Sequence, residues 1–202
     1  MQPLDFVNQF YPFAKKVEDE TGLPALFVVA QCALETGWGE SVAGNNMFGI
    51  KDSDGLNGNE QLVATLEFHS KPDQKYPVIL SIEEVVTGKR WKYRVKDWFR
   101  KYPTPYESFA DHAKLLLSAK RYKSAWEFSM KSANPNPEEF AKTICRAGYA
   151  TAPNYEETIL LMMKSVRKRL SKDGKPLAPP KPPPIETPPP NLEDSFDLTN
   201  RK

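Results

Sequence analysis

The sequence of 202 residues has little of what builds metal sites or disulfide frameworks: two cysteines and two histidines. Cys32 and Cys145 both lie in apolar, helix-like stretches, so we expect buried free thiols. A disulfide between them stays open, because the sequence does not give their separation. His69 and His112 each stand without other ligand residues at metal-site spacing. No metal and no other cofactor are therefore expected.

The chain also lacks a charge excess and a long apolar run. Its net charge of +2 argues against a nucleic-acid partner, because such domains concentrate basic residues on one face. A mildly anionic polymer such as cell wall suits it better. No stretch approaches the roughly 20 apolar residues of a membrane span, and residues 1–5 lack the charged and apolar regions of a signal peptide. We expect a soluble monomer with no visible export signal.

Proline is concentrated near one end of the chain. Nine of the 19 prolines fall within residues 176–190. Such a run favours an extended polyproline conformation and cannot build a core. We therefore predict a globular domain over residues 1–171 and a proline-rich, extended or disordered tail over residues 172–202. A linker, a spacer and a ligand for a protein partner are the alternatives for this tail.

One apolar stretch is expected to organise the fold. From Leu23 to Leu34 the only polar residue is Gln31, which is typical of a helix that is buried on every side. Pro24 suits a first helical position, and Gly37 suits the left-handed residue that ends a helix. The pattern predicts a helix of about three turns at the centre of the molecule.

Glu35 stands in the last turn of this predicted helix. The negative end of the helix dipole and the apolar neighbours both disfavour a charged carboxylate at that position. Both effects raise its pKa toward the range of a proton donor. The alternative is a solvated carboxylate at a helix end that has no chemical role.

The rest of the sequence predicts an α+β fold that is mainly α. Helical spacing of apolar residues recurs in the segments 5–20, 108–119, 122–130, 136–148 and 154–170. Ser108 and Asp111 form an approximate capping pair. A small antiparallel sheet is expected within residues 60–102, from strands over 62–68, 78–86 and 91–99 with Thr87-Gly88 as a hairpin turn.

Five linked motifs carry a resemblance to a known family. In chain order they are Ala30-Gln31 with Leu34-Glu35-Thr36-Gly37-Trp38-Gly39, Asn46-Met47-Phe48-Gly49-Ile50-Lys51, Phe99-Arg100-Lys101-Tyr102, Ser108-Phe109-Ala110-Asp111-His112, and Ala147-Gly148-Tyr149-Ala150-Thr151 followed by Tyr155. Over residues 5–170 the chain resembles bacterial and phage N-acetylglucosaminidases that cleave peptidoglycan, related to the flagellar rod-type hydrolases (glycoside hydrolase family 73). The resemblance implies a lysozyme-like fold, with a cleft between a helical lobe and a small β lobe.

The resemblance also implies roles for two carboxylates, which is the number that glycoside hydrolysis usually needs. Glu35 matches the general acid of the family. The family's second acid lies in a β-hairpin a few residues before a turn glycine, and Glu84 matches it best. Glu83, Glu67 and assistance by the acetamido group of the substrate itself stay open as alternatives.

Further cleft residues follow from the same motifs. Tyr149 matches a tyrosine that reaches the cleft near the acid, where a phenol can hydrogen-bond a sugar; a core tyrosine is the alternative. Trp38 either offers a stacking face for a sugar or seals the apolar surroundings of Glu35. The loop 43–51 is expected to form the cleft floor. The other substrate-binding candidates are Asn46, Phe48 and Tyr155.

These observations predict a hydrolase of β-1,4 bonds in peptidoglycan that acts as an endo-β-N-acetylglucosaminidase. Its partner is the glycan strand, which it would meet in the periplasm, outside the cell, or as a phage lysis or virion protein. A muramidase or lytic transglycosylase that uses Glu35 alone is the first alternative. A catalytically silent wall-binding or assembly module is the second.

Overall fold

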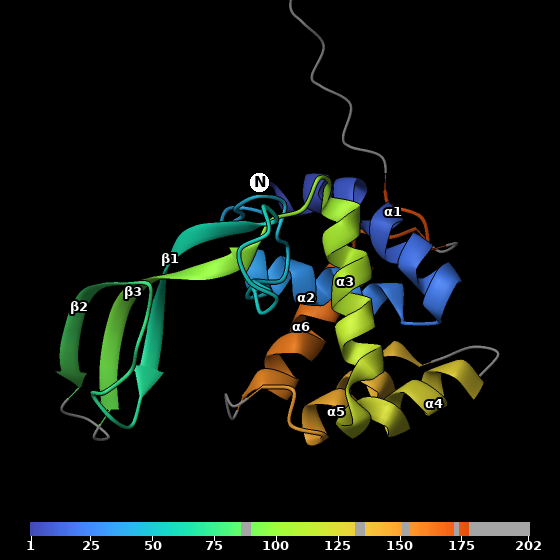
Figure 1. Cartoon of the computed structure of the whole chain (residues 1–202). Helices are drawn as coiled ribbons and strands as arrows, with labels where there is room; N and C mark the ends of the chain where they lie inside the picture. Colours follow the sequence, from blue (N-terminus) through green and yellow to red (C-terminus); the bar gives the residue numbers. More distant parts are fainter. Residues whose placement is uncertain (86–89, 132–135, 151–153, 172–173, 178–202) are drawn as a thin grey trace, which may run out of the picture.

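The computed structural model describes residues 1–85, 90–131, 136–150, 154–171 and 174–177. In these residues the helices form one body, and a three-stranded sheet projects from its side (Figure 1). The elements are α1 (Pro3–Thr21), α2 (Ala25–Thr36), β1 (Glu60–His69), β2 (Val78–Val85), β3 (Arg90–Arg100), α3 (Pro105–Ser118), the 3-10 turn η1 (Lys120–Tyr122), α4 (Lys123–Lys131), α5 (Pro137–Arg146) and α6 (Tyr155–Arg167). The predicted fold class is confirmed.

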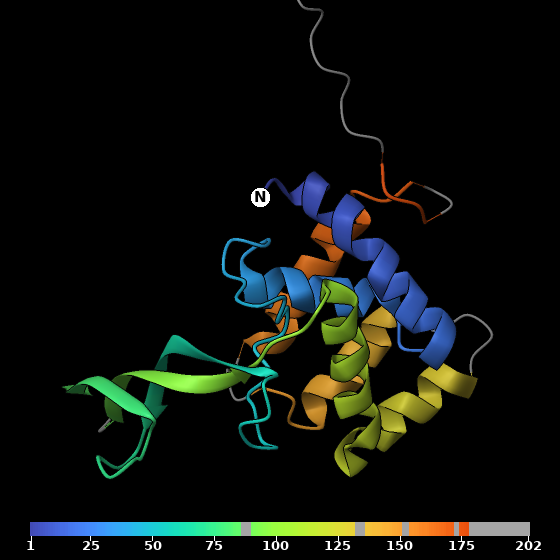
Figure 2. The same ribbon diagram turned by 45° about the horizontal axis from the view of Figure 1, so that its top comes forward.

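α2 is the central helix, as its composition predicts. Every residue from Ala25 to Ala33 is buried, and α1, α5 and α6 pack around it (Figure 2). Gly37 ends the helix in the left-handed conformation, with φ of 56°. Pro24 is the cap rather than the first helical residue, and its carbonyl accepts hydrogen bonds from the N–H groups of Phe27 and Val28 at 3.0 and 3.1 Å.

An aromatic cluster joins α1, α3 and the loop that follows α2. Phe109 of α3 is fully buried. The rings of Phe10, Phe13 and Phe48 lie 6.4, 6.1 and 5.0 Å from the Phe109 ring, measured between centroids. Aromatic pairs at such distances contribute about 0.5–1.5 kcal/mol each beyond their buried area. Phe109 therefore holds the loop 43–51 against the helical body.

The sheet is antiparallel, with strand order β1-β3-β2. The pair Gln61 and Phe99 lies at the end next to the helices, and the pair His69 and Trp91 lies near the far end. β2 contains a bulge between Ile79 and Ser81. The three predicted strands are confirmed to within two residues at each end, while the predicted turn Thr87-Gly88 lies outside the described residues.

Two ion-pair clusters connect the sheet to α3 and to the loop that follows α2. Arg100, at the end of β3, lies 2.6 Å from Asp111 of α3, and the Tyr102 hydroxyl donates a hydrogen bond to the same carboxylate at 2.7 Å. The Nζ atom of Lys51 lies 2.9 Å from a carboxylate oxygen of Glu67 and 2.9 Å from one of Asp97. β3 continues toward α3 at the end of the sheet next to the helices, and the other end of the sheet projects away from the helical body (Figure 1).

α3 begins three residues earlier than predicted. Thr104 is its N-cap, Pro105 is its first residue, and the Glu107 side chain completes a capping box by accepting from the Thr104 N–H at 3.1 Å. Ser108 is buried inside the helix, where its hydroxyl oxygen accepts a hydrogen bond from the Met47 N–H at 3.0 Å. The predicted pairing of Ser108 with Asp111 is therefore wrong, because the threonine, proline and glutamate before it already start the helix.

Cys32 and Cys145 are both free thiols.

After α6 the chain turns back, and the Leu177 N–H donates a hydrogen bond to the Arg169 carbonyl at 2.9 Å. The predicted boundary at residue 171 falls inside this turn, and residues 178–202 of the predicted tail lie outside the described residues. Within the described part of the chain, no helix combines the length and apolarity that crossing a membrane requires.

Candidate active site

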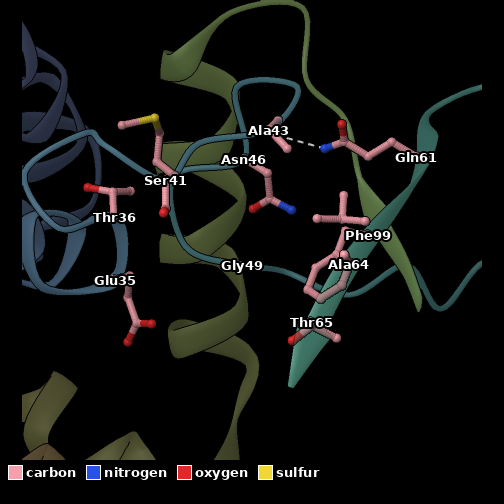
Figure 3. A pocket seen from close by; sticks show the side chains of 12 residues that line it. Glu35, Thr36, Ser41, Ala43, Asn46, Gly49, Gln61, Ala64, Thr65 and Phe99 are labelled. Atoms are coloured by element: carbon pink, nitrogen blue, oxygen red, sulfur yellow. Dashed lines mark hydrogen bonds between the residues drawn. The ribbon is translucent and has the colours of Figure 1, made fainter. Parts of the chain in front are cut away.

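A pocket of about 170 Å³ lies where the C-terminal end of α2 faces the base of the sheet (Figure 3). Glu35 forms part of its helical side, Asn46 part of its floor, and Thr65 and Phe99 part of its sheet side. The Gln61 amide donates a hydrogen bond to the Ala43 carbonyl at 2.7 Å and so ties β1 to the floor loop. The expected cleft between helices and sheet is present.

Glu35 occupies the last turn of α2 and lines this pocket. Its carboxylate is open to solvent, yet the surrounding protein removes part of its water shell, and this desolvation raises its pKa above the usual glutamate value. In the described part of the chain, no cation or hydrogen-bond donor compensates for the lost water. The neutral, proton-carrying form is favoured as a result, in the direction that the sequence predicts.

Three polar side chains lie close to Glu35 on the α6 side of α2. Gln31 is fully buried one turn before Glu35, and its amide donates a hydrogen bond to the Tyr155 hydroxyl at 3.3 Å. The rings of Tyr149 and Tyr155 lie 5.6 Å apart. Burial raises the pKa of Tyr155 to about 12 and that of Tyr149 further, with a contribution from the Glu35 charge. Both phenols therefore keep their protons and act as hydrogen-bond donors.

Gln31 is the member of this group that sequence reasoning did not select for the site. The sequence does single out Gln31, because it is the only polar residue between Leu23 and Leu34. Residues four apart on a helix share a face, so Gln31 lies beneath Glu35. A buried amide in that place orients the tyrosines rather than the substrate.

Asn46 lines the pocket, but its side chain forms hydrogen bonds with backbone groups of the protein. The amide N–H₂ group donates to the carbonyls of Ile50 and Arg100 at 2.8 and 3.0 Å, and the amide oxygen accepts from the Ile50 N–H at 3.0 Å. These bonds close the loop and tie it to the end of β3. Asn46 therefore shapes the pocket floor.

Phe48 and Trp38 pack against other side chains and are not among the residues that line the pocket. Phe48 is 9% exposed and stacks on the His112 ring, with 3.9 Å between centroids. Trp38 packs edge-on against Phe6 at 5.5 Å, and the Arg169 guanidinium lies 5.2 Å from its ring. These contacts are with α1 and with the chain after α6, and both interpretations of Trp38 stay predictions.

The β-lobe carboxylates do not gather at Glu35. Glu84 pairs with Trp91 at the far end of the sheet, whereas Phe99 lines the pocket. Trp91 and Phe99 are eight positions apart on β3, which corresponds to about 26 Å of strand. Glu83, the neighbour of Glu84 on β2, forms an ion pair with Lys92 at 3.5 Å.

Glu67 is the nearest of the three candidates to the pocket, two positions beyond Thr65 on β1. Residues two apart on a strand share a face and lie about 7 Å apart. Asp97, which sequence reasoning did not select, pairs with the pocket residue Val63 across the strands. Lys51 bridges both acids at 2.9 Å, so the two carboxylates share one positive charge near the edge of the pocket.

A partly desolvated acid ends a buried helix here and faces a pocket that a small antiparallel sheet completes. Fold and site together are those of a lysozyme-like domain.

Comparison with known families gives the particular family. Residues 11–168 match the glucosaminidase family, described as mannosyl-glycoprotein endo-beta-N-acetylglucosaminidase. The chain belongs to this family.

Individual relatives agree with this assignment. The chain is 31% identical over 170 residues to the peptidoglycan hydrolase FlgJ of Vibrio parahaemolyticus, covering 81% of this chain and 47% of the relative. It is 34% identical to the exo-glucosaminidase LytG of Bacillus subtilis, covering 68% of this chain and 42% of that protein. The chain thus spans less than half of the length of both relatives.

A solved structure shows the same fold. A peptidoglycan hydrolase mutant from Sphingomonas sp. A1 superposes with a TM-score of 0.58 at 27% identity, covering 82% of this chain and 96% of the other.

Proposed function

We propose that this domain hydrolyses the β-1,4 bonds of peptidoglycan glycan strands as an endo-β-N-acetylglucosaminidase. The observation that carries the proposal is Glu35, an acid with a raised pKa that lines a pocket between the helices and the sheet. Membership of the glucosaminidase family supports the same chemistry. The site of action would be the cell wall, reached from the periplasm, from outside the cell, or by a phage lysis or virion protein.

In the proposed reaction Glu35 begins protonated and donates its proton to the oxygen of the leaving sugar. The glycosidic bond breaks as positive charge develops on the other sugar ring, and water completes the hydrolysis. Tyr149 and Tyr155 hold their protons beside the acid. They would donate hydrogen bonds to the sugar or to an intermediate.

Product analysis tests the proposal. Digestion of purified peptidoglycan should release fragments that end in reducing N-acetylglucosamine. Reducing N-acetylmuramic acid or an anhydro-sugar would instead identify a muramidase or a lytic transglycosylase. Release of no fragments by the wild-type protein would leave the wall-binding module as the function.

Glu84 is proposed as the second carboxylate, and its position adds a requirement. Because it lies far along the sheet from the pocket, the sheet must swing toward the helices about its base for Glu84 to reach the sugar. We expect Glu84→Gln to lower kcat about 10²-fold or more, while Glu83→Gln, the matched neighbour, retains wild-type kcat. Full activity of Glu84→Gln would assign the stabilising role to the acetamido group of the substrate.

The pH dependence of activity should follow Glu35. A general acid must be protonated in the free enzyme, so kcat/KM should fall as pH rises through the raised pKa of Glu35. The descending limb should therefore lie above the ordinary glutamate pKa of about 4.3. A soluble N-acetylated oligosaccharide is the appropriate substrate, because it carries no groups that titrate in this range. A descending limb at or below the ordinary value would contradict the role of Glu35.

A further inference from the structure

One face of the sheet carries a row of basic side chains. Lys92, Arg94 and Lys96 alternate along β3, and alternate residues of a strand point to the same face. We call these three residues the basic face. Leu66 and Phe68 of β1 pair with Arg94 and Lys92 across the strands and are 53% and 49% exposed. The face is therefore both cationic and apolar.

The charge of the basic face is only partly compensated. Glu83 of β2 lies 3.5 Å from Lys92. Among the described residues, neither Arg94 nor Lys96 forms an ion pair, and both are exposed. Two cations thus remain available, next to an exposed leucine and phenylalanine, for a ligand that carries carboxylates and small apolar groups.

The basic face and the sheet side of the Glu35 pocket, formed by Thr65 and Phe99, are opposite faces of the sheet that meet at the outer strand β1. A groove of about 690 Å³ runs over it and includes Leu66, Lys92 and Arg94 in its walls. Ala64 and Thr65 line this groove and also the pocket of Glu35. The side groups of a polymer strand bound at Glu35 would therefore reach the basic face by passing around the outer edge of β1 at these two residues.

We propose that the basic face binds the peptide stems of peptidoglycan while the glycan strand occupies the Glu35 pocket. This inference rests on the proposed function. Stem peptides carry free carboxylates, which match Arg94 and Lys96, and short alkyl side chains, which match Leu66 and Phe68.

Binding by the full chain in the Glu35→Gln background tests this without digestion of the ligand. The probes are intact peptidoglycan and glycan strands from which an amidase has removed the stems. The stripped strands keep the lactyl carboxylate of each N-acetylmuramic acid, so they control for charge on the glycan itself. The variant Arg94→Gln/Lys96→Gln is compared with Lys114→Gln/Lys164→Gln, which removes two exposed positive charges from α3 and α6.

We expect the Arg94→Gln/Lys96→Gln variant to bind intact peptidoglycan about five- to tenfold more weakly than the control variant, as two exposed ion pairs would give. The two variants should bind stripped strands equally. Salt at about 1 M should abolish the difference on intact peptidoglycan, because it screens exposed charges.

Equal binding of both variants to intact peptidoglycan, or the same loss on stripped strands, would overturn the proposal. Neither result depends on catalysis. Failure of the proposed function would show separately, as a wild-type protein that releases no fragments from the wall.

Discussion

Glu35→Gln should lower kcat on purified peptidoglycan by about 10²–10⁴-fold, the usual contribution of a general acid. Glutamine keeps the size and shape of the side chain but has no proton to give to the leaving oxygen. The pocket that Glu35 lines would be unchanged in outline, so binding should persist while bond cleavage fails. The release of reducing ends from purified peptidoglycan measures the effect.

The matched control for this variant is Glu40→Gln, which removes an exposed acid five residues along the chain, with a side chain 77% exposed. It should retain wild-type activity. A Glu35→Gln protein with more than a tenth of wild-type activity would rule out Glu35 as the acid.

Thermal unfolding separates loss of chemistry from loss of fold. Because the pKa of Glu35 is raised in the folded state, its ionisation destabilises the protein as pH rises through that value. At pH 8 the unfolding midpoint of Glu35→Gln should therefore equal or exceed that of the wild type. At pH values below the ordinary glutamate pKa the two midpoints should become equal.

Phe109→Ala should cost about 3–5 kcal/mol of folding stability. The Phe109 side chain is fully buried and contacts the rings of Phe10, Phe13 and Phe48, which belong to α1 and to the floor loop. Alanine would leave a cavity where these segments meet. For a domain of this size the midpoint of thermal unfolding should fall by about 10 °C, measurable by circular dichroism.

Phe68→Ala is the matched control, since Phe68 is 49% exposed on β1. Its unfolding midpoint should stay within about 2 °C of wild type, because exposed substitutions rarely exceed about 0.5 kcal/mol. A Phe109→Ala protein as stable as this control would show that the aromatic cluster does not join α1 to the floor loop as described.

The helical body could be predicted from sequence because its signals are local. The run from Leu23 to Leu34 with its single polar residue specifies a buried helix, and Gly37 marks its end. The start of α3 was missed, although Thr104, Pro105 and Glu107 carry the capping signals. The apolar spacing resumes only after them, so the periodicity alone places the start of the helix three residues too late.

The site was predictable in part, and for a physical reason. An acid at the end of an apolar helix is unusual, so Glu35 stands out. Aromatic residues such as Trp38 and Phe48 are the same residue types whether they stack on a sugar or fill a core, so sequence could not separate the two. The distance of Glu84 from the pocket depends on how the sheet is fastened to the helices, through pairs such as Arg100 with Asp111, which are far apart in sequence.

The bulge in β2 interrupts an exposed edge of the sheet. β2 is an outer strand of the sheet, and its residues Val78, Ile79 and Leu80 are 37%, 43% and 49% exposed. A straight apolar border of this kind would invite a second chain to add on and start aggregation. The irregularity between Ile79 and Ser81 disrupts the even spacing of N–H and C=O groups that such an addition needs, so it disfavours the pairing of a second chain along this part of β2.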